Sequence, residues 1–396
     1  MIEIEQAYET LAAWCRARGF AGHDPFDGLN SRLFQMMPLK NSRMARLAWT
    51  QAFKRLPFSL RTLARVPVGR NSKGTALFAL AALSRFRATD TREAEKEARE
   101  LLDALLAAQL AGWSGACWGY NFDWQGRAFF APQGTPTIVP TAFAARALVE
   151  AARAFDDEKY LRAARSACDF ILRDLKRSEE SAEEVCFSYT PLDETRVFNA
   201  SLLAAETLGS VAALTKEAEL LSVSIRAARY VVRRQSASGA WAYGAAEFQG
   251  WADNFHTAFI LTSLARIMEA SDEARMEFAT TLKRGSEFWR ERFFLADGWP
   301  KYYHDNPYPA DAHSTGAAVV ALVELKDSMA DSLALADRII GWTLDNLRDP
   351  RRGFFYYQRR RFYLVRTPYM RWTQAWMMYA LARRIEIAEC GMRIVD

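Results

Sequence analysis

Two aspartates and two histidines recur at matching places in the second half of the sequence. Asp253 and Asp311 are separated by 311 − 253 = 58 residues, and His256 and His313 follow them within three residues. A pair of carboxylates can supply an acid and a base, and imidazoles transfer protons near neutral pH. The same side chains could instead cap helices or lie buried in hydrogen bonds. We predict these four as catalytic groups, with Tyr302 as a further proton-transfer residue, and the structural alternative stays open.

Aromatic and polar side chains crowd the segments around these residues. Trp and Tyr offer flat apolar faces with a polar tip, which suits stacking on sugar rings, although each could also be a wedge that packs a helix end. Arg371 lies between Tyr369 and Trp372 and is a candidate for a two-pronged contact with a carboxylate or phosphate. The predicted substrate-binding residues are Trp118, Tyr120, Asn121, Asp123, Trp124, Arg127, Tyr189, Trp241, Tyr243, Trp299, Tyr369, Arg371 and Trp372.

The sequence gives no sign of a metal site or a cofactor. Neither an HxxxH nor an HExxH spacing is present, and the five cysteines are scattered without a CxxC pair. An odd number of scattered cysteines also argues against a disulfide framework. We therefore predict no metal ion, no cofactor and reduced thiols.

A repeat sets the position of the candidate residues. Small polar residues followed by apolar stretches occur at Thr141, Asn199, Thr257, Thr315 and Thr373, and every step, for example 199 − 141, equals 58 residues. A sixth copy begins at Thr75, and its step of 141 − 75 = 66 residues predicts an insertion in the following loop. Stretches that are apolar almost all round are typical of buried helices.

Charged, amphipathic segments alternate with the buried stretches and open with acidic and close with basic residues, as helices prefer. This alternation predicts an all-α fold, an (α/α)6 barrel of six helical hairpins with short β-hairpins in the rim loops. We predict a single domain over 1–396, in which 1–40 form a helix and a segment packed on the barrel and 41–396 form the six hairpins. The inner helices should begin on one rim, where the candidate residues would meet.

The charge pattern bears on partners and location. A net charge of +5 arises from 52 basic and 47 acidic residues spread along the chain, which does not favour a nucleic-acid partner. The N-terminus lacks the basic and apolar regions of a secretion signal, and no apolar run reaches the length of a membrane span. We therefore expect a cytoplasmic protein with no membrane span, and the sequence makes no prediction of its oligomeric state.

Three segments carry a resemblance to known proteins. CWGYNFDWQ, DNFHTAFILTSL and YMRWTQAWMMYAL resemble bacterial toroid proteins of polysaccharide biosynthesis, and the arrangement is similar to six-hairpin glycosidases, polysaccharide lyases, sugar 2-epimerases, uronate C5-epimerases and, more distantly, terpene cyclases. QSASGAW is similar to the Gln-Gly-Trp repeats of terpene cyclases, but the DxDD motif of their acid-initiated class is missing. The zinc-binding Cys and His residues of prenyltransferases and lanthionine cyclases are missing too.

The resemblance and the candidate residues together imply three functions. The first is a carbohydrate-active enzyme on a bacterial poly- or oligosaccharide that contains uronic acid, acting as an epimerase or lyase by proton transfer, or as a glycoside hydrolase. The second is a noncatalytic glycan-binding or scaffold protein of polysaccharide assembly. The third is a terpene-cyclase-like toroid on an isoprenoid or lipid-linked substrate. Catalysis requires acid–base groups that converge in one cavity, whereas the third function requires an apolar cavity floor.

Overall fold

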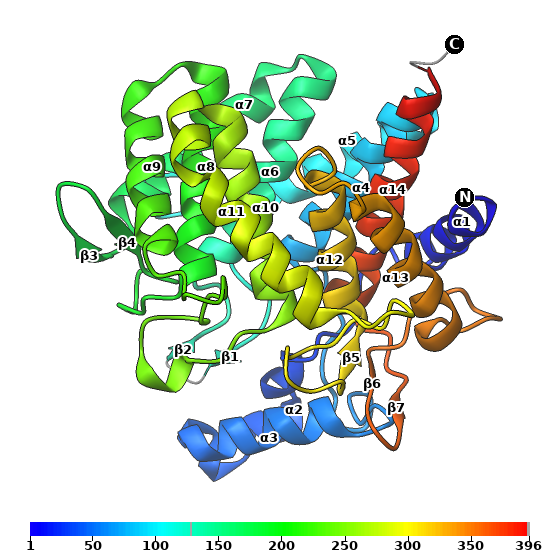
Figure 1. The fold of residues 1–396 in the computed structure, drawn as a ribbon. Helices are drawn as coiled ribbons and strands as arrows, with labels where there is room; N and C mark the ends of the chain where they lie inside the picture. Colours follow the sequence, from blue (N-terminus) through cyan, green and yellow to red (C-terminus); the bar gives the residue numbers. More distant parts are fainter. Residues whose placement is uncertain (127–128, 394–396) are drawn as a thin grey trace.

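Six buried helices form a closed ring in the computed structural model, which describes residues 1–126 and 129–393 (Figure 1). Each inner helix packs against the next one, and the last packs against the first. The inner helices are α4 (Ser72–Thr89), α6 (Ile138–Phe155), α8 (Phe198–Thr215), α10 (Asn254–Ala270), α12 (Ala312–Glu324) and α14 (Trp376–Arg393), the last preceded by a π-helical segment η4 (Met370–Ala375).

Six further helices of the described chain pair with the inner helices on the outside of this ring. They are α1 (Ile2–Arg16), α5 (Arg92–Ala107), α7 (Glu158–Arg173), α9 (Ala218–Val232), α11 (Asp272–Phe293) and α13 (Ser332–Leu347). Five of them follow their inner helix along the chain, and α1 packs on α14, so the two ends of the chain form the sixth pair. The predicted all-α, (α/α)6 barrel fold is confirmed.

The repeated threonines mark the first turn of the inner helices. The hydroxyls of Thr75, Thr257 and Thr315 donate to the carbonyl oxygen four residues earlier, at distances of 3.2, 2.7 and 3.3 Å. These carbonyls belong to the residue that caps the helix, such as Asp253 and Asp311. At these three positions a buried threonine therefore stabilises the start of the helix without leaving its own hydroxyl unpaired.

Ion pairs join the inner helices in their C-terminal halves. The pairs are Arg146–Glu206, Arg266–Glu150, Arg266–Glu324, Arg87–Glu150, Arg87–Glu386, Arg383–Glu324 and Arg383–Glu386. Arg146 and Glu206 are both buried and share two hydrogen bonds of 2.7 and 2.5 Å. Charges inside the ring are thus neutralised by partners on other inner helices or, for Arg383–Glu386, on the same helix.

Short elements lie between the helices and before the ring. The strands are β1 (Trp124–Gln125), β2 (Phe130–Ala131), β3 (Arg177–Glu180), β4 (Val185–Phe187), β5 (Ala310–Asp311), β6 (Gln358–Arg359) and β7 (Leu364–Val365). They pair antiparallel as β1-β2, β3-β4 and β5-β6-β7. The β1-β2 hairpin lies in the long loop for which the 66-residue step predicts an insertion. The short helices are η1 (Asp27–Asn30), α2 (Arg32–Gln35), η2 (Pro38–Asn41), α3 (Arg43–Arg55) and η3 (Glu247–Gln249).

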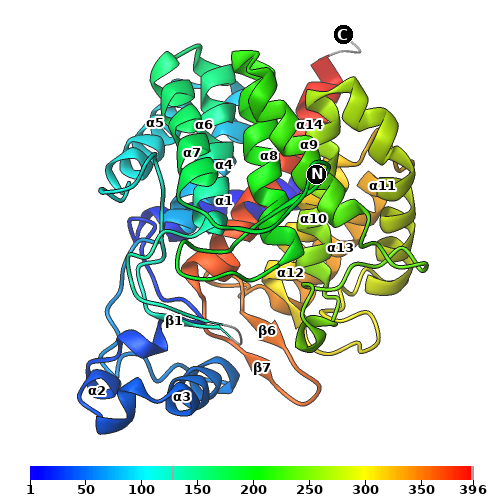
Figure 2. The ribbon, with the colours of Figure 1, turned by 90° about the vertical axis from the view of Figure 1, so that its left-hand side faces the viewer.

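The segment that contains α2 and α3 lies at the end of the barrel where the inner helices begin, together with β1, β6 and β7 (Figure 2). Two buried ion pairs hold its start in place. Asp24 accepts two hydrogen bonds from Arg371, at 2.5 and 2.8 Å, and Asp27 accepts one from Arg61 at 2.7 Å. No helix of the described residues is long and apolar enough to cross a membrane.

We expect Glu206→Ala to lower the free energy of unfolding by about 3–5 kcal/mol, because it leaves the buried guanidinium of Arg146 unpaired and removes the acceptor of the Ser263 hydroxyl. Urea denaturation measures the change. The exposed pair Arg162–Glu158 offers a control, and Glu158→Ala should cost less than about 1 kcal/mol. Equal losses in the two variants would show that the ion pairs inside the ring do not stabilise it.

Candidate functional site

A cavity of about 390 Å³ opens at the end of the ring where the inner helices begin. Its walls include one residue from each inner-helix start, always two positions before the repeated threonine or asparagine. These residues, which we call the cavity floor, are Lys73, Val139, Val197, Phe255, His313 and Arg371. The same register in six helices thus brings distant parts of the chain to one place.

The cavity floor is polar on one side and apolar on the other. Lys73, His313 and Arg371 come from neighbouring positions in the ring, because η4 packs against both α4 and α12. The remaining floor residues are valines and a phenylalanine. Lys73 was not among the residues predicted from the sequence. The signal was present, since Lys73 precedes Thr75 as His313 precedes Thr315.

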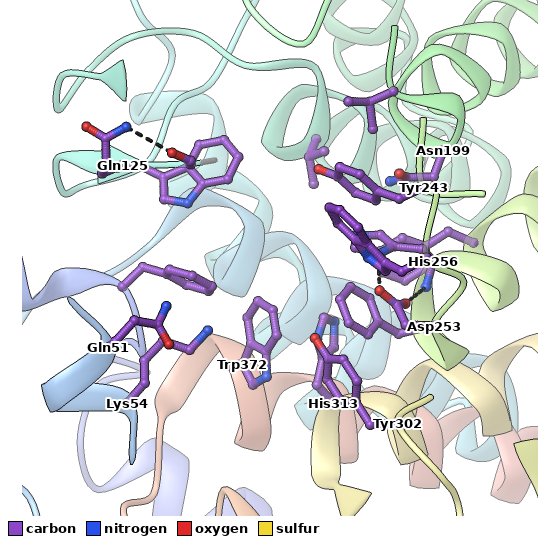
Figure 3. Close-up of a pocket in the computed structure, with 18 of the residues that line it drawn as sticks. Gln51, Lys54, Gln125, Asn199, Tyr243, Asp253, His256, Tyr302, His313 and Trp372 are labelled. Atoms are coloured by element: carbon purple, nitrogen blue, oxygen red, sulfur yellow. Dashed lines mark hydrogen bonds and ion pairs between the residues drawn. The ribbon is translucent and has the colours of Figure 1, made fainter. Parts of the chain in front are cut away.

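Asp253 and His256 form a hydrogen-bonded pair on the cavity wall (Figure 3). Asp253 Oδ1 accepts from the backbone N–H of His256 at 2.9 Å, and Asp253 Oδ2 lies 2.7 Å from His256 Nδ1. An ionised carboxylate can only accept hydrogen bonds, so the shared proton belongs to Nδ1 and Nε2 keeps a lone pair. The helix cap therefore fixes the tautomer of a histidine that can act as a base.

His313 lies buried in the floor against aromatic rings. Its ring centroid is 4.1 Å from that of Trp372 and 4.4 Å from that of Phe255. Neither ring nitrogen has a hydrogen-bond partner among the described residues. Burial holds the pKa of His313 well below its usual range, and the positive charges of Lys73 and Arg371 lower it further. His313 is thus a neutral imidazole with an unused donor and an unused acceptor.

The Lys73 ammonium lies above three aromatic rings that fill the axis of the barrel. Its Nζ is 4.6 Å from the ring centroid of Phe143, 4.9 Å from that of Phe259 and 5.3 Å from that of Trp376. Within the described residues Lys73 has no ion pair. Burial, and to a lesser extent the positive charge of Arg371, lowers the pKa of Lys73 well below its usual value. Such a group gains most from a negative charge that forms in the cavity.

Tyrosine hydroxyls on the cavity wall stay protonated. The pKa of Tyr302 is raised well above its usual value by burial and by the negative charges of Asp253 and Asp311. Burial also raises the pKa values of Tyr120 and Tyr189. These phenols can donate a proton or a hydrogen bond, but they do not act as bases at neutral pH.

Helix α3 supplies the wall opposite the Asp253–His256 pair. Gln51 and Lys54 face the cavity from this helix, and Gln125 of β1 lies beside them (Figure 3). Burial lowers the pKa of Lys54 to about 8. The segment between α1 and α4 therefore forms part of the site.

Arg371 lies in the floor, but an internal partner already occupies much of its guanidinium. Its Nε and Nη2 donate to the two carboxylate oxygens of Asp24. This pairing neutralises the charge with which the sequence analysis expected to hold a substrate carboxylate. The guanidinium also lies 5.2 Å from the ring centroid of Tyr120, so it supports the aromatic wall.

Asp311 occupies the same register as Asp253 but has another environment. It caps α12 by accepting from the backbone N–H of Ser314 at 2.7 Å, and it is fully buried. It does not line the cavity, so the two aspartates do not face each other across it. Burial raises the pKa of Asp311 to about 6.

The structure brings ten of the sequence-predicted site residues to the cavity and leaves others away from it. Those in the wall or floor are Tyr120, Trp124, Tyr189, Tyr243, Asp253, His256, Tyr302, His313, Arg371 and Trp372. Those that do not line it are Trp118, Asn121, Asp123, Trp241, Trp299, Asp311 and Tyr369. Arg127 lies outside the described residues.

The predicted residues away from the cavity have structural partners. The indole N–H groups of Trp118 and Trp241 donate to carbonyl oxygens of the outer helices α5 and α9, at 2.7 and 3.0 Å. Trp299 donates to the carbonyl of Pro307. These tryptophans therefore pack helix ends and rim loops, which was the structural alternative for the aromatic segments.

Metal binding finds no support in the described part of the chain, where no group of three or more His, Cys, Asp or Glu side chains could hold an ion.

The fold is similar to that of several solved proteins. A cellobiose 2-epimerase of Bacillus thermoamylovorans has a TM-score of 0.63 at 13% identity, with 82% of this chain and 90% of that chain covered. A GH76 α-mannanase of Bacteroides thetaiotaomicron has a TM-score of 0.59 at 12% identity, covering 82% and 87%. An unsaturated glucuronyl hydrolase specific for heparin has a TM-score of 0.58 at 14% identity, covering 80% and 86%.

At these identities the likeness establishes the fold. The chain shares the (α/α)6 toroid that these enzymes have in common. No protein-family model matches the sequence, and no curated protein matches it either.

Asp311 predicts a pH-dependent stability. Its pKa of about 6 in the folded protein exceeds the roughly 3.9 of an unfolded chain, so the folded state binds more protons between these values. The free energy of unfolding should therefore fall as pH rises through this window. This decrease is complete above about pH 6. Asp311→Asn keeps the helix cap but removes the titration.

The stability of Asp311→Asn relative to the unchanged protein should consequently rise by about 2 kcal/mol between roughly pH 4 and pH 7.5. Urea denaturation at several pH values measures this difference. A difference that stays constant with pH would contradict the assigned environment of Asp311.

Proposed function

We propose that this protein is a carbohydrate-active enzyme that moves a proton on a carbon next to the carbonyl or carboxylate group of a sugar. The observation that carries the proposal is a set of buried, unpartnered polar atoms in an aromatic cavity. They are both ring nitrogens of His313, Oδ1 of Asn199 and Oε1 of Gln358. Buried polar groups are costly unless a ligand or water satisfies them, and sugar hydroxyls can both donate and accept.

The aromatic wall suits the same class of ligand. Trp124, Tyr189, Tyr243, Trp251 and Trp372 all contribute to it. The apolar faces of sugar rings pack on aromatic rings, while their hydroxyls reach the polar atoms between them. A purely isoprenoid ligand would leave the polar atoms of the floor unsatisfied, so the terpene-cyclase-like alternative is less well supported.

The two histidines are the proposed proton-transfer groups. His256 has its proton on Nδ1, held by Asp253, so Nε2 is available as the base. Developing negative charge on the sugar would be stabilised by Lys73 and by donated hydrogen bonds from Tyr302. His313, a second imidazole from another helix, could return a proton from a different direction, as an epimerisation requires.

Glycoside hydrolysis is less well supported by the cavity. Hydrolysis by acid–base catalysis usually needs two carboxyl groups on either side of the scissile bond. Among the described residues, Asp253 is the one carboxylate that lines the cavity, and His256 already holds it. We therefore favour epimerase or lyase chemistry over hydrolysis.

A uronate-containing glycan is the proposed substrate, acted on in bacterial polysaccharide biosynthesis in the cytoplasm. Since Asp24 neutralises Arg371, Lys73 and Lys54 are the groups proposed to hold the sugar carboxylate, whose negative charge would favour their protonated forms. The fold neighbours named as a cellobiose 2-epimerase and a glucuronyl hydrolase support a carbohydrate and are compatible with a uronate.

Incubation with sugars in heavy water tests the reaction class. Cellobiose and uronate-containing oligosaccharides are suitable substrates, and NMR and mass spectrometry report the products. Deuterium on the carbon next to the carbonyl or carboxylate group (an epimerase), or a new double bond at that carbon with cleavage of the neighbouring C–O bond (a lyase), would support the proposal. Cleavage with neither deuterium nor a double bond at that carbon, or no change in any glycan, would contradict it and favour a hydrolase or a glycan-binding protein.

Asp253→Asn should lower kcat by about 10²–10⁴-fold. The amide still caps α10, but its NH2 group would face Nδ1 of His256 and favour the tautomer whose Nε2 is protonated and cannot act as a base. Asp311→Asn is the matched control, because Asp311 has the same register and the same capping role without lining the cavity. Its kcat should stay within about threefold of the unchanged protein, and equal losses in both variants would refute the role of the Asp253–His256 pair.

A further inference from the structure

The segment that carries α2 and α3 has an uneven charge that the balance of the whole chain conceals. Between Asp27 and Asp90 the sequence has no acidic residue. Residues 28–70 contain nine basic residues, which are Arg32, Lys40, Arg43, Arg46, Lys54, Arg55, Arg61, Arg65 and Arg70. Arg32, Lys40, Arg55 and Arg65 are exposed and, within the described residues, form no ion pair. One end of the molecule is therefore strongly basic.

The same segment exposes large apolar side chains. Of the exposed large hydrophobic residues in the described chain, a group lies between residues 33 and 68, and it consists of Leu33, Met36, Met37, Leu39, Met44, Phe58, Leu63 and Val68. Met36 is 82% exposed and Met44 is 73% exposed. Apolar residues that gather in this way on a monomer usually mark a surface that binds something.

The β6-β7 hairpin extends this surface. Phe362 at its tip is 86% exposed and follows three arginines, Arg359–Arg361. The hydroxyl of its neighbour Tyr363 donates to the carbonyl of Arg55 at the end of α3, so the hairpin tip and the helix lie together. Figures 1 and 2 place α2, α3 and the hairpin at the same end of the molecule.

Helix α3 separates the exposed surface from the cavity. Met44, Ala48 and Ala52 recur at helical spacing and are exposed, whereas Gln51 and Lys54 on the adjoining side of the helix line the cavity. The apolar surface therefore lies next to the cavity wall that α3 supplies.

We propose that this end of the protein, from α2 and α3 to the tip of the β6-β7 hairpin, docks on the surface of a bilayer that contains anionic lipids. Basic residues attract the lipid headgroups, and exposed Met, Leu and Phe side chains insert at the boundary of the acyl chains. The protein lies on the membrane and does not span it.

Two other occupants fit the surface less well. A second copy of the chain would bring two basic surfaces of the same kind together, and like charges repel. A nucleic acid would match the charge, but it gives no reason for exposed methionines and leucines. The combination of positive charge and apolar side chains is what an anionic bilayer complements. Docking there would place a cavity wall beside the bilayer, where a lipid-carried glycan could reach it.

Vesicle binding tests the proposal independently of catalysis. The full chain is sedimented with vesicles of phosphatidylcholine alone and with vesicles that also contain phosphatidylglycerol. We expect at least about tenfold stronger binding to the anionic vesicles, weakened by salt. Equal binding to both vesicles, or binding to neither, would overturn the proposal.

A triple variant, Met36→Ser, Met44→Ser and Phe362→Ser, should lower binding to anionic vesicles by about tenfold or more. The control is Met276→Ser on the outer helix α11, where Met276 is 81% exposed, and it should bind as the unchanged protein does. Lys40→Gln with Arg65→Gln should lower both the binding and its sensitivity to salt. Circular dichroism confirms that each variant folds.

Three results would overturn the proposal even where vesicles bind. One is a loss in Met276→Ser as large as in the triple variant. The second is a dimer in sedimentation velocity that the triple variant dissociates, which would assign the surface to a second copy. The third is tighter binding to an oligonucleotide than to anionic vesicles. Since none of these measurements involves a sugar, a failure of the proposed enzymatic function would leave them unaffected.

Discussion

The closed ring of buried helices limits where polar side chains can lie in this protein. Each inner helix is covered by its two neighbours and an outer helix, so polar side chains inside the ring must find partners there. In the C-terminal halves of the helices they do, through pairs such as Arg146–Glu206. At the N-terminal ends His313 and Asn199 keep unpartnered atoms beside a cavity. One half of the ring is thus satisfied internally, and the other half keeps polar atoms that a ligand or water can satisfy.

Residues at equivalent positions of the repeats have different roles at the cavity. Asp253 and Asp311 share a register and both cap a helix, yet the first holds His256 in the cavity wall and the second is buried outside the cavity. The difference lies in the next turn, where a histidine follows Asp253 by three residues and Asp311 by two. In a helix a shift of one residue turns a side chain by about 100°. His313 consequently lies in the floor, without the carboxylate that orients His256.

The sequence was sufficient for the fold because a 58-residue period and apolar helices repeat along the chain. Ten of the eighteen predicted site residues line the cavity, because they lie just before or at the start of the helices of the ring. It did not reveal that Asp24 neutralises Arg371, because an ion pair between residues so far apart depends on how the N-terminal segment folds over the ring. Lys73 was not predicted, because the six floor residues differ in chemical type and only their shared register connects them.

The central claim is that the unpartnered polar atoms of the cavity bind the hydroxyl groups of a sugar. A crystal structure of the protein with a uronate-containing oligosaccharide tests it most directly. The claim predicts a sugar ring against Tyr243 or Trp372, with hydroxyls or the carbonyl oxygen within hydrogen-bond distance of His313, Asn199 and Gln358. A sugar bound elsewhere on the protein, or bound in the cavity without contact to these three side chains, would contradict it.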